Sequence, residues 1–454
     1  MSVAIVLFTR DLRVHDNPVL HAAATSADRV IPLFVLDDAI IGSRYNRPNR
    51  AAFLAECLRD LDEGLRELGV RLVIRRGDVT EEVALLAAEH GAAEVHIAAD
   101  VSAYSHRREN ALRDRLEAER RALHVHETVI TVVPPGAITP SGRDHFAVYT
   151  PYFRQWSAAP KRGVLGTPAR LSMPRLDAGT VPGQADICRG ATAPELPAGG
   201  ERAGRQLLRD WLNGPVRDYG RRHDDLAAGG TSRLSPHLHF GSLSATELVQ
   251  RAGADSSGAR DFVRQVAWRD FHHQVLAARP RAVTEDYRTH HDDWRRSPAD
   301  LTAWREGRTG YPIVDAGMRQ LQREGWMHNR ARLIVGSFLT KTLYLDWRCG
   351  ARHFLDLLVD ADVANNQLNW QWIAGTGTDS RPNRVLNPLA QARRYDPDGD
   401  YVRRYVPELA GVSGARVHEP WRLPEDERER LGYPRPIVDL RDGSDRFLTA
   451  RGKR

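Results

Sequence analysis

The first 130 residues alternate short β-branched runs with amphipathic helical stretches, and this alternation constrains the fold more than any other feature of the chain. Short, continuous apolar runs of about four to eight residues are typical of strands buried inside a parallel sheet. Leucines recur at steps of three and four residues from Leu54 to Leu68, which places them on one helical face. The pattern predicts an α/β, doubly wound, Rossmann-like domain. The expected strands are residues 3–8, 30–35, 71–74, 95–98 and 125–129.

The remainder of the chain divides into a connecting stretch and a helical part. Residues 134–200 are rich in Pro, Gly, Ala and Ser and show little sustained periodicity, which predicts a long linker over the surface. Beyond Glu201 the strand signals fade and helical patterns follow one another. We therefore expect an α/β domain at 1–133, a linker at 134–200 and an all-α domain at 201–454.

Composition narrows the class of protein. No apolar run approaches the length of a membrane span, and the first residues do not form a signal peptide, so we expect no membrane partner. Cys57, Cys188 and Cys349 lie far apart without a CxxC pair, which favours a reducing cytoplasm. The net charge of +6 permits nucleic-acid binding without proving it. Nothing in the sequence requires more than a monomer.

Common catalytic and metal-binding signatures are absent from the sequence. The pair Gly375 and Gly377 lacks the preceding strand and the third glycine of a dinucleotide fingerprint, and there is no P-loop, HExxH or GxSxG motif. The pairs His272-His273 and His290-His291 are sequence neighbours, which on a helix point to different sides. We therefore favour capping or surface roles for them and predict no metal site.

Residues 360–372 form a dense run of carboxylates, amides and indoles within a segment that otherwise has a helical core pattern. So many polar groups need partners, and a polar, aromatic ligand would supply them. Arg332 and Asp360 could form a buried ion pair, while Asp362 could accept from a ribose hydroxyl or a ring N–H. Without a ligand, such carboxylates are more often charges on a helix surface.

A hydroxyl cluster, Thr231-Ser-Arg-Leu-Ser235, precedes a proline and a helical pattern, and Tyr219 stands twelve residues before it. Hydroxyls and free N–H groups at the start of a helix can hold a phosphate. A plain N-cap is the alternative, and on this segment alone it is favoured.

Long motifs occur in one order along the chain: FTRDLRVHDNPVL, TSRLSPHLHFG, VAWRDFHH, TGYPIVDAGMRQL, GWMHNRARLI, VDADVANNQLNWQWIAGTGTD and RPNRVLNP. With these motifs the chain resembles the DNA photolyase and cryptochrome family over nearly its whole length. Photolyases that repair cyclobutane pyrimidine dimers are closest in character. Several long motifs in the same order are far more specific than one short glycine pattern.

The resemblance implies a non-covalent FAD in the helical domain. Asn366 would face flavin N5, where an amide oxygen can accept from a protonated nitrogen and favour the reduced flavin that repair needs. Such an amide supports a repair enzyme over a plant-like cryptochrome. The implied cofactor-binding residues are Tyr219, Thr231, Ser232, Arg233, Leu234, Ser235, Trp268, Arg332, Asp360, Asp362 and Asn366.

The resemblance also implies UV-damaged DNA as the partner, with the dimer flipped out of the duplex into a pocket. Trp268 and Trp372 would cradle the dimer between apolar walls. A single tryptophan on a helix more often belongs to core packing, so these roles for Trp268 and Trp372 depend on all the motifs occurring together. The implied lesion-binding residues are Gln265, Trp268, Asn329, Arg330, Leu333 and Trp372.

The implied reaction is light-driven: reduced FAD gives one electron to the dimer, the cyclobutane ring splits and the electron returns. The spacing of Trp294, Trp347 and Trp370 matches the family's electron relay from the surface to the flavin. This relay would photoreduce oxidised flavin and is not needed for the repair step. The implied catalytic set is completed by Asn366 and Gln265.

Two positions depart from the family pattern. Gln265 stands where dimer photolyases usually carry a glutamate, and glutamine cannot transfer a proton. Leu333 stands where methionine is frequent. A glutamine at the position of Gln265 also occurs in (6-4) photolyases, but those enzymes carry a histidine pair at the positions of Asn329 and Leu333. A (6-4) activity is therefore disfavoured. The main alternative is a cryptochrome-type blue-light photoreceptor without repair activity.

The resemblance implies a second, light-harvesting chromophore in the N-terminal domain. Arg50, Asp100 and Glu109 would lie in the loops that contact it, although each alone fits an ordinary surface charge. The sequence leaves open whether the chromophore is methenyltetrahydrofolate or 8-hydroxy-5-deazaflavin.

Overall fold

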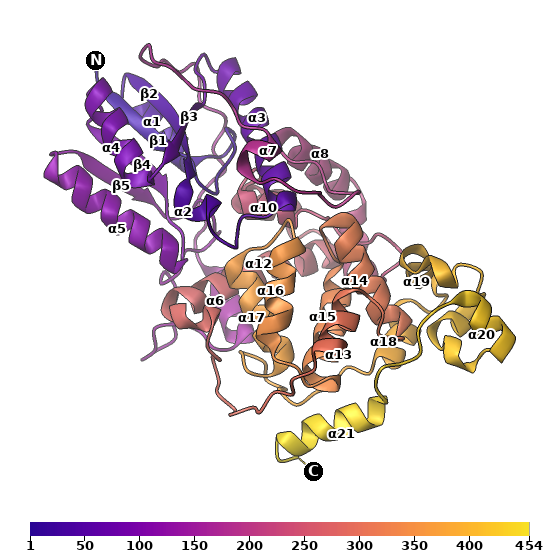
Figure 1. Cartoon of the computed structure of the whole chain (residues 1–454). Coiled ribbons are helices and arrows are strands. Elements are labelled where there is room, and N and C mark those ends of the chain that lie inside the picture. The colour runs from indigo at the N-terminus through magenta and orange to yellow at the C-terminus, as the bar shows by residue number, and fades with distance from the viewer. Residues whose placement is uncertain (454) are drawn as a thin grey trace.

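A computed structural model describes residues 1–453 and shows an α/β part packed against a larger helical part (Figure 1). The α/β part contains a five-stranded sheet of order β3-β2-β1-β4-β5, and all its strand pairs are parallel. The strand order reverses beside β1, as in doubly wound sheets. The strands are β1 (Val3–Leu7), β2 (Arg29–Asp37), β3 (Val73–Gly77), β4 (Glu94–Ala98) and β5 (Ala122–His126).

Helices cover both faces of this sheet, which explains why its central strand is apolar at every position. All of β1 is buried. Its alternate residues belong to two cores, because side chains alternate across a strand: Ala4 and Val6 pack with α1 and α3, whereas Ile5 packs with α4 and α5. The helices of this part are α1 (Pro18–Ser26), α2 (Asp38–Ile41), α3 (Pro48–Glu67), α4 (Val79–His90) and α5 (Ala103–Ala118).

The predicted strands coincide with β1, β2 and β4, whereas β3 and β5 are displaced from their predicted positions. The strand predicted at residues 125–129 extends past the end of β5, because the chain there leaves the sheet and crosses to the helical part. The backbone N–H groups of Val132 and Val133 donate to Asp270 Oδ2 at 2.9 and 3.0 Å. Val132 and Val133 therefore belong to the core of the helical part.

The prediction that residues 134–200 form a surface linker is wrong for the first half of this stretch. There the chain forms helix α6 (Tyr149–Ala158). Tyr149, Tyr152 and Trp156 are buried in one core cluster with residues of α12. They recur at three- and four-residue steps, but the helix is short and proline-rich sequence surrounds it. Farther on, the chain returns to the α/β part, where Val30 N donates to Ser172 O at 2.8 Å.

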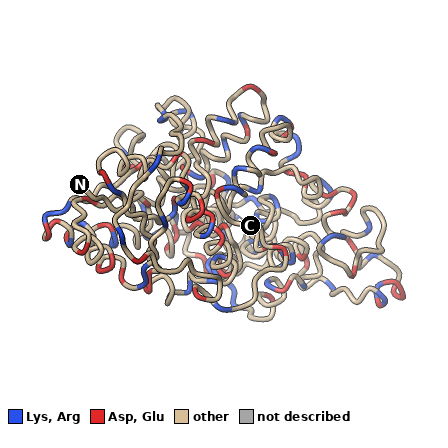
Figure 2. Tube along the Cα trace, turned by 90° about the horizontal axis from the view of Figure 1, so that it is seen from above, with Lys and Arg blue, Asp and Glu red and all other residues tan. Residues whose placement is uncertain are grey.

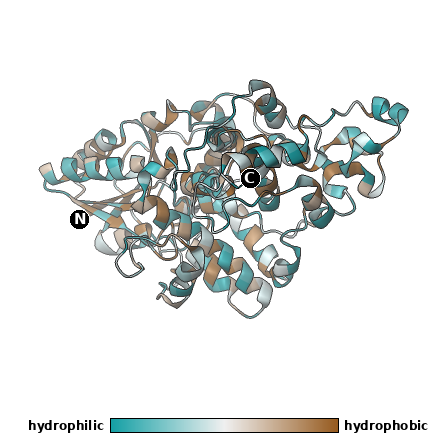
Figure 3. Ribbon diagram, turned by 90° about the horizontal axis from the view of Figure 1, so that it is seen from below, coloured by the Kyte–Doolittle hydropathy of each residue, from teal (hydrophilic) through white to brown (hydrophobic). Residues whose placement is uncertain are grey.

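The helical part confirms the predicted change from strands to helices. Positive and negative residues are interleaved over both parts (Figure 2), and hydrophobic and hydrophilic turns alternate along many helices (Figure 3). Within residues 1–453, no helix has both the length and the apolar character needed to cross a membrane. The remaining α-helices are α7 (Gln184–Ile187), α8 (Glu201–Leu212), α9 (Tyr219–Arg222), α10 (Ser235–Phe240), α11 (Ala245–Ala252), α12 (Ser257–Ala278), α13 (Pro298–Arg305), α14 (Pro312–Glu324), α15 (Asn329–Ser337), α16 (Trp347–Leu357), α17 (Val363–Ala374), α18 (Pro388–Tyr395), α19 (Asp400–Tyr405), α20 (Glu425–Leu431) and α21 (Leu440–Ala450). Shorter helical turns are η1 (Pro215–Asp218), η2 (Pro280–Val283), η3 (Phe338–Thr342), η4 (Pro407–Leu409), η5 (Gly414–His418) and η6 (Pro420–Arg422).

Asp270 joins three segments of the protein, because its Oδ2 also accepts from Trp156 Nε1 at 2.9 Å. We expect Asp270→Ala to lower the free energy of unfolding by about 3 kcal/mol or more, since it leaves three buried donors without an acceptor. Urea unfolding followed by circular dichroism would measure the change. Asp255→Ala, which removes an exposed carboxylate, is the matched control, and equal stability of the two variants would contradict the prediction.

Candidate functional site

A cavity of about 370 Å³ opens between α10, α12, α15 and α17 of the helical part. Its volume lies in the range of sites that hold small molecules and cofactors. Most residues predicted to bind a cofactor or a lesion are in its wall, although they come from distant parts of the sequence. These are Tyr219, Thr231, Ser232, Arg233, Leu234, Ser235, Gln265, Trp268, Asn329, Arg332, Leu333, Asp360, Asp362 and Trp372.

The hydroxyl cluster contributes one side of the cavity. Leu234 occupies the N-cap position of α10 and makes no side-chain capping bond, so the plain N-cap alternative does not describe this segment. Arg233 has a φ of 53°, which bends the chain sharply between Ser232 and Leu234. Thr231, Ser232 and Ser235 are all in the cavity wall, and Ser235 Oγ accepts from Trp326 Nε1 at 3.1 Å. Hydroxyl groups there are suited to phosphate or ribose oxygens.

Arg332 and Asp360 form the predicted ion pair, with Arg332 Nη2 donating to Asp360 Oδ2 at 2.8 Å. Arg332 Nε also donates to Met327 O at 2.9 Å, which fixes the guanidinium. The second carboxylate oxygen, Asp360 Oδ1, is buried and finds no hydrogen-bond partner among residues 1–453. A buried acceptor without a donor is costly, so this oxygen fits a ligand that carries N–H or O–H groups.

Asp362 has partners in both parts of the protein. It accepts from Asn365 N at 2.8 Å as the N-cap of α17, forms an ion pair with Arg10, and lies 3.4 Å from His273 Nε2. Burial would raise the pKa of Asp362, but the charges of His273 and Arg10 outweigh burial and hold that pKa well below its usual range. Asp362 is thus an ionised anchor between the two parts as well as a member of the cavity wall.

Helix α17 presents one face to the cavity. Asp362, Asn365, Asn369 and Trp372 are all in the wall, at steps of three, four and three residues. The prediction missed Asn365 and Asn369, although this helical spacing from Asp362 and Trp372 would have identified them. Both amides can donate and accept, which enlarges the polar surface offered to a ligand.

Asn366 lies one helical turn after Asp362, at the flank of the face that lines the cavity, and is not itself in the cavity wall. Its Nδ2 donates to Ala351 O of α16 at 3.1 Å and to Gln367 Oε1 at 2.8 Å. These two acceptors fix the orientation of the amide, so Asn366 Oδ1 is the atom that remains to accept from a ligand.

The prediction of surface or capping roles is wrong for His272 and His273, which are both buried in α12. They do point to different sides, as expected of helical neighbours. His272 is in the cavity wall, with Nδ1 3.1 Å from Asn365 Oδ1, whereas His273 Nδ1 lies 2.8 Å from Arg269 O. Burial lowers the pKa of His272 to about 4, which makes this ring neutral at physiological pH. Its position four residues after Trp268 was the available signal. His290 and His291 are exposed, as predicted.

The predicted lesion-binding residues do not all lie in the cavity wall. Trp268 is half-buried and stacks on Tyr149, with ring centroids 3.7 Å apart and planes 6° apart. Gln265 and Asn329 are exposed members of the cavity wall, as expected for groups at its rim. Arg330 is outside the wall, because Asp224 holds its guanidinium at 2.7 Å and it lies 4.4 Å above the ring of Tyr395.

Trp294, Trp347 and Trp370 all pack in one hydrophobic cluster beside the cavity. Trp347 and Trp370 are buried, and Trp294 is half-buried at the edge of the cluster. Trp347 Nε1 donates to Asp286 Oδ1 at 2.8 Å. A further indole, Trp304, is fully buried with its ring centroid 6.0 Å from that of Trp370. Trp304 was not among the predicted residues, and its contacts are those of a core side chain.

The structure does not bring the three predicted antenna residues together, and the prediction that they lie in loops is wrong for two of them. Arg50 is buried in α3 and donates to Leu358 O at 2.8 Å. Glu109 lies in α5, where it pairs with Arg113 at 3.1 Å. Asp100 follows β4 and pairs with Arg10 at 3.2 Å.

The sequence profiles of two families match the chain: DNA photolyase at residues 4–172 and the FAD binding domain of DNA photolyase at residues 262–453. A deoxyribodipyrimidine photo-lyase of Streptomyces griseus is 59% identical, with 100% of each chain covered. The structure of a class III photolyase from Agrobacterium tumefaciens has a TM-score of 0.93 at 32% identity, covering 100% of this chain and 97% of that one. The structure of a Synechocystis cryptochrome has a TM-score of 0.92 at 27% identity, covering 99% of each chain. The predicted fold class is therefore confirmed.

Arg332 provides a test of the cavity as the FAD site. We expect Arg332→Ala to weaken FAD binding at least about ten-fold, because it removes a charge-assisted bond and leaves Asp360 buried without its cation. The ratio of flavin to protein after dialysis and the dissociation constant on reconstitution would measure the loss. Arg393→Ala, which breaks an exposed ion pair with Glu419, is the matched control. Equal FAD affinity of both variants would contradict this assignment.

Proposed function

The chain belongs to the DNA photolyase family, and we propose that it is a light-driven repair enzyme that splits cyclobutane pyrimidine dimers in UV-damaged DNA. The observation that carries this proposal is the shared cavity: Trp268 and Trp372 are in the same wall as Arg332 and Asp360. A flipped-out lesion held by the indoles would thus lie beside the cofactor. The similarity to a deoxyribodipyrimidine photo-lyase over the whole chain supports the same substrate.

The donor set of the cavity fits FAD. Hydroxyls of Thr231, Ser232 and Ser235 would hold phosphate and ribose oxygens, and Arg332 with Asp360 would hold the flavin ring system. Reduced FAD, when bound, supplies the light-driven electron transfer. Asn366 would offer its amide oxygen to flavin N5, since Ala351 and Gln367 already occupy its nitrogen.

The residues of the chain position the lesion and exclude water. Tyr149 holds the Trp268 ring by stacking, so this indole offers a rigid apolar wall to an unstacked base. Trp372 would form a second wall. Gln265 and Asn329 at the rim would donate N–H groups to pyrimidine carbonyls, but neither amide can transfer a proton. Arg330 would reach the DNA only after leaving Asp224.

We also propose that Trp294, Trp347 and Trp370 carry electrons from the surface to oxidised FAD. Their membership of one packed cluster, half-buried at Trp294, supports this role. The protein would act as a cytoplasmic monomer, with the antenna in residues 1–133 and the repair region in residues 201–454. Of the connecting residues 134–200, α6 would support the repair region, because it packs in the helical core.

A second chromophore, methenyltetrahydrofolate or 8-hydroxy-5-deazaflavin, would bind the α/β part. A cavity of about 230 Å³ lies where β4 ends, and its wall includes Asp100, His106 and Pro134. We expect the chromophore released from protein purified from its native source to absorb in the near-ultraviolet or violet-blue region. An absorption spectrum after denaturation would identify it, and release of FAD alone would contradict the proposal.

The repair proposal is tested with chemically reduced, FAD-loaded protein and an oligonucleotide that carries one dimer. We expect blue light to remove the dimer and darkness to leave it intact. Trp268→Ala should weaken binding of the dimer oligonucleotide about ten-fold, since stacking contributes ~1–3 kcal/mol per base. Trp421→Ala removes a half-buried indole outside the cavity and is the control. No light-dependent loss of dimers would contradict repair and favour a photoreceptor.

A further inference from the structure

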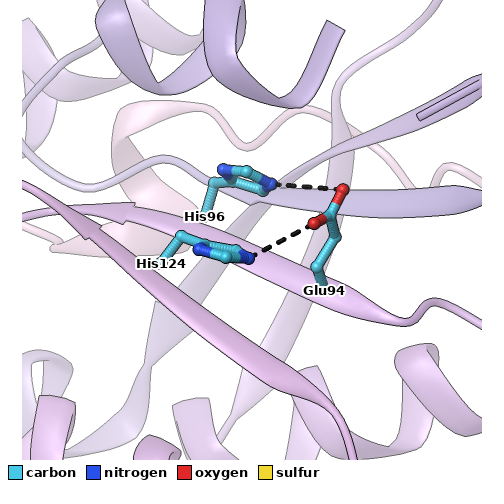
Figure 4. Close-up of side chains that lie close together, drawn as sticks. All are labelled: Glu94, His96 and His124. Carbon is cyan, nitrogen blue, oxygen red and sulfur yellow. Dashed lines mark ion pairs between the residues drawn. The ribbon is translucent and has the colours of Figure 1, made fainter. Parts of the chain in front are cut away.

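Four polar side chains gather on one face of the sheet at its edge, in the α/β part. Glu94 and His96 belong to β4, and His124 and His126 belong to β5. His96 pairs directly with His124 in the strand register, and side chains two residues apart share a face. Glu94, His96 and His124 therefore converge, as Figure 4 shows.

The ligand-type atoms of three of these residues lie close together. Glu94 Oε1 is 3.6 Å from His96 Nε2, and Glu94 Oε2 is 3.2 Å from His124 Nε2. One such atom from each residue lies within 4.8 Å of the other two. Bonds of ~2.0–2.1 Å to a tetrahedral Zn²⁺ separate ligand atoms by about 3.3 Å. Small side-chain rotations would thus bring all three residues onto one ion.

The surroundings prepare His96 as a ligand. Its Nδ1 lies 3.0 Å from His126 Nε2, and the rings stack at 5.3 Å. Metal-bound histidines commonly donate their other ring N–H to a fixed acceptor, and His126 Nε2 is placed to be that acceptor, which would fix the tautomer and the ring plane.

The carboxylate is also held in place. Ser26, the last residue of α1, donates its hydroxyl to Glu94 Oε1. This bond comes from a different element than the histidines, so the carboxylate is fixed independently of them. Ser26 Oγ is also 3.5 Å from His96 Nε2. The cluster is thus built from two strands and one helix.

We propose that Glu94, His96 and His124 bind a divalent transition-metal cation and that Zn²⁺ is the ion best suited to them. Two imidazoles and one carboxylate suit Zn²⁺, whereas Mg²⁺ and Ca²⁺ prefer oxygen ligands. His124 is exposed, so water completes the coordination. The site shares no residue with the repair cavity. Its ion would clamp the edge strand β5 to β4, just before the chain crosses to the helical part.

The test titrates chelator-treated, FAD-loaded protein with ZnSO4 in a calorimeter, and with CoCl2 as a spectroscopic probe. We expect one equivalent of Zn²⁺ to bind per chain and Co²⁺ to give the visible absorption of a tetrahedral site. His124→Ala and Glu94→Gln should each weaken Zn²⁺ binding about 10–100-fold or more. His290→Ala, which removes an exposed histidine of the helical part, should leave the affinity unchanged.

Thermal unfolding provides a second measurement. Zn²⁺ should raise the melting temperature of the wild-type protein and of His290→Ala, but not that of His124→Ala. Metal-free His124→Ala should melt with the metal-free wild type, because this side chain is about half exposed and surface pairs such as His124 with Glu94 contribute little. The proposal is overturned if the wild type binds no stoichiometric Zn²⁺, or if His124→Ala and Glu94→Gln bind it with unchanged affinity.

Discussion

The buried charge of Asp362 is the interaction on which the arrangement of the protein depends. A carboxylate removed from water needs several donors, and Asp362 takes them from Arg10 in the α/β part and from the start of α17 in the helical part. Arg10 in turn pairs with Asp100 and donates to His239 O. The junction of the two parts and the first turn of α17 are therefore fixed by the same charge.

A second buried carboxylate, Asp270, holds helix α12 against two other segments of the chain. Asp270 binds the crossing segment and α6, which brings Tyr149 behind Trp268. Trp268 and His272, on the cavity side, thus have their positions set by contacts on the opposite side of the helix. A segment that the sequence suggests is only a linker provides the support for a residue of the proposed lesion site.

The sequence predicted the fold well where one physical signal dominated. Burial on both faces made β1 continuously apolar, and the leucines of α3 followed the helical period. The prediction failed where burial came from a distant partner: Val132 and Val133 are apolar because they pack in one cluster with α12, and α6 is too short for its period to stand out. Within the site, the motifs located Arg332, Asp360 and Trp268. They could not reveal that Asp224 holds Arg330 away from the cavity, since that contact joins residues 106 positions apart.

The two faces of α17 explain how the proposed site and the proposed electron relay can share one helix. Asp362, Asn365, Asn369 and Trp372 face the cavity, whereas Trp370 packs against α16. The contact with α16 is so close that a Cβ added at Gly350 would lie 2.2 Å from the Trp370 ring. The ring therefore has little freedom to move. Because both faces belong to one rigid helix, the position of Trp370 relative to the cavity is set by backbone geometry and needs no separate support.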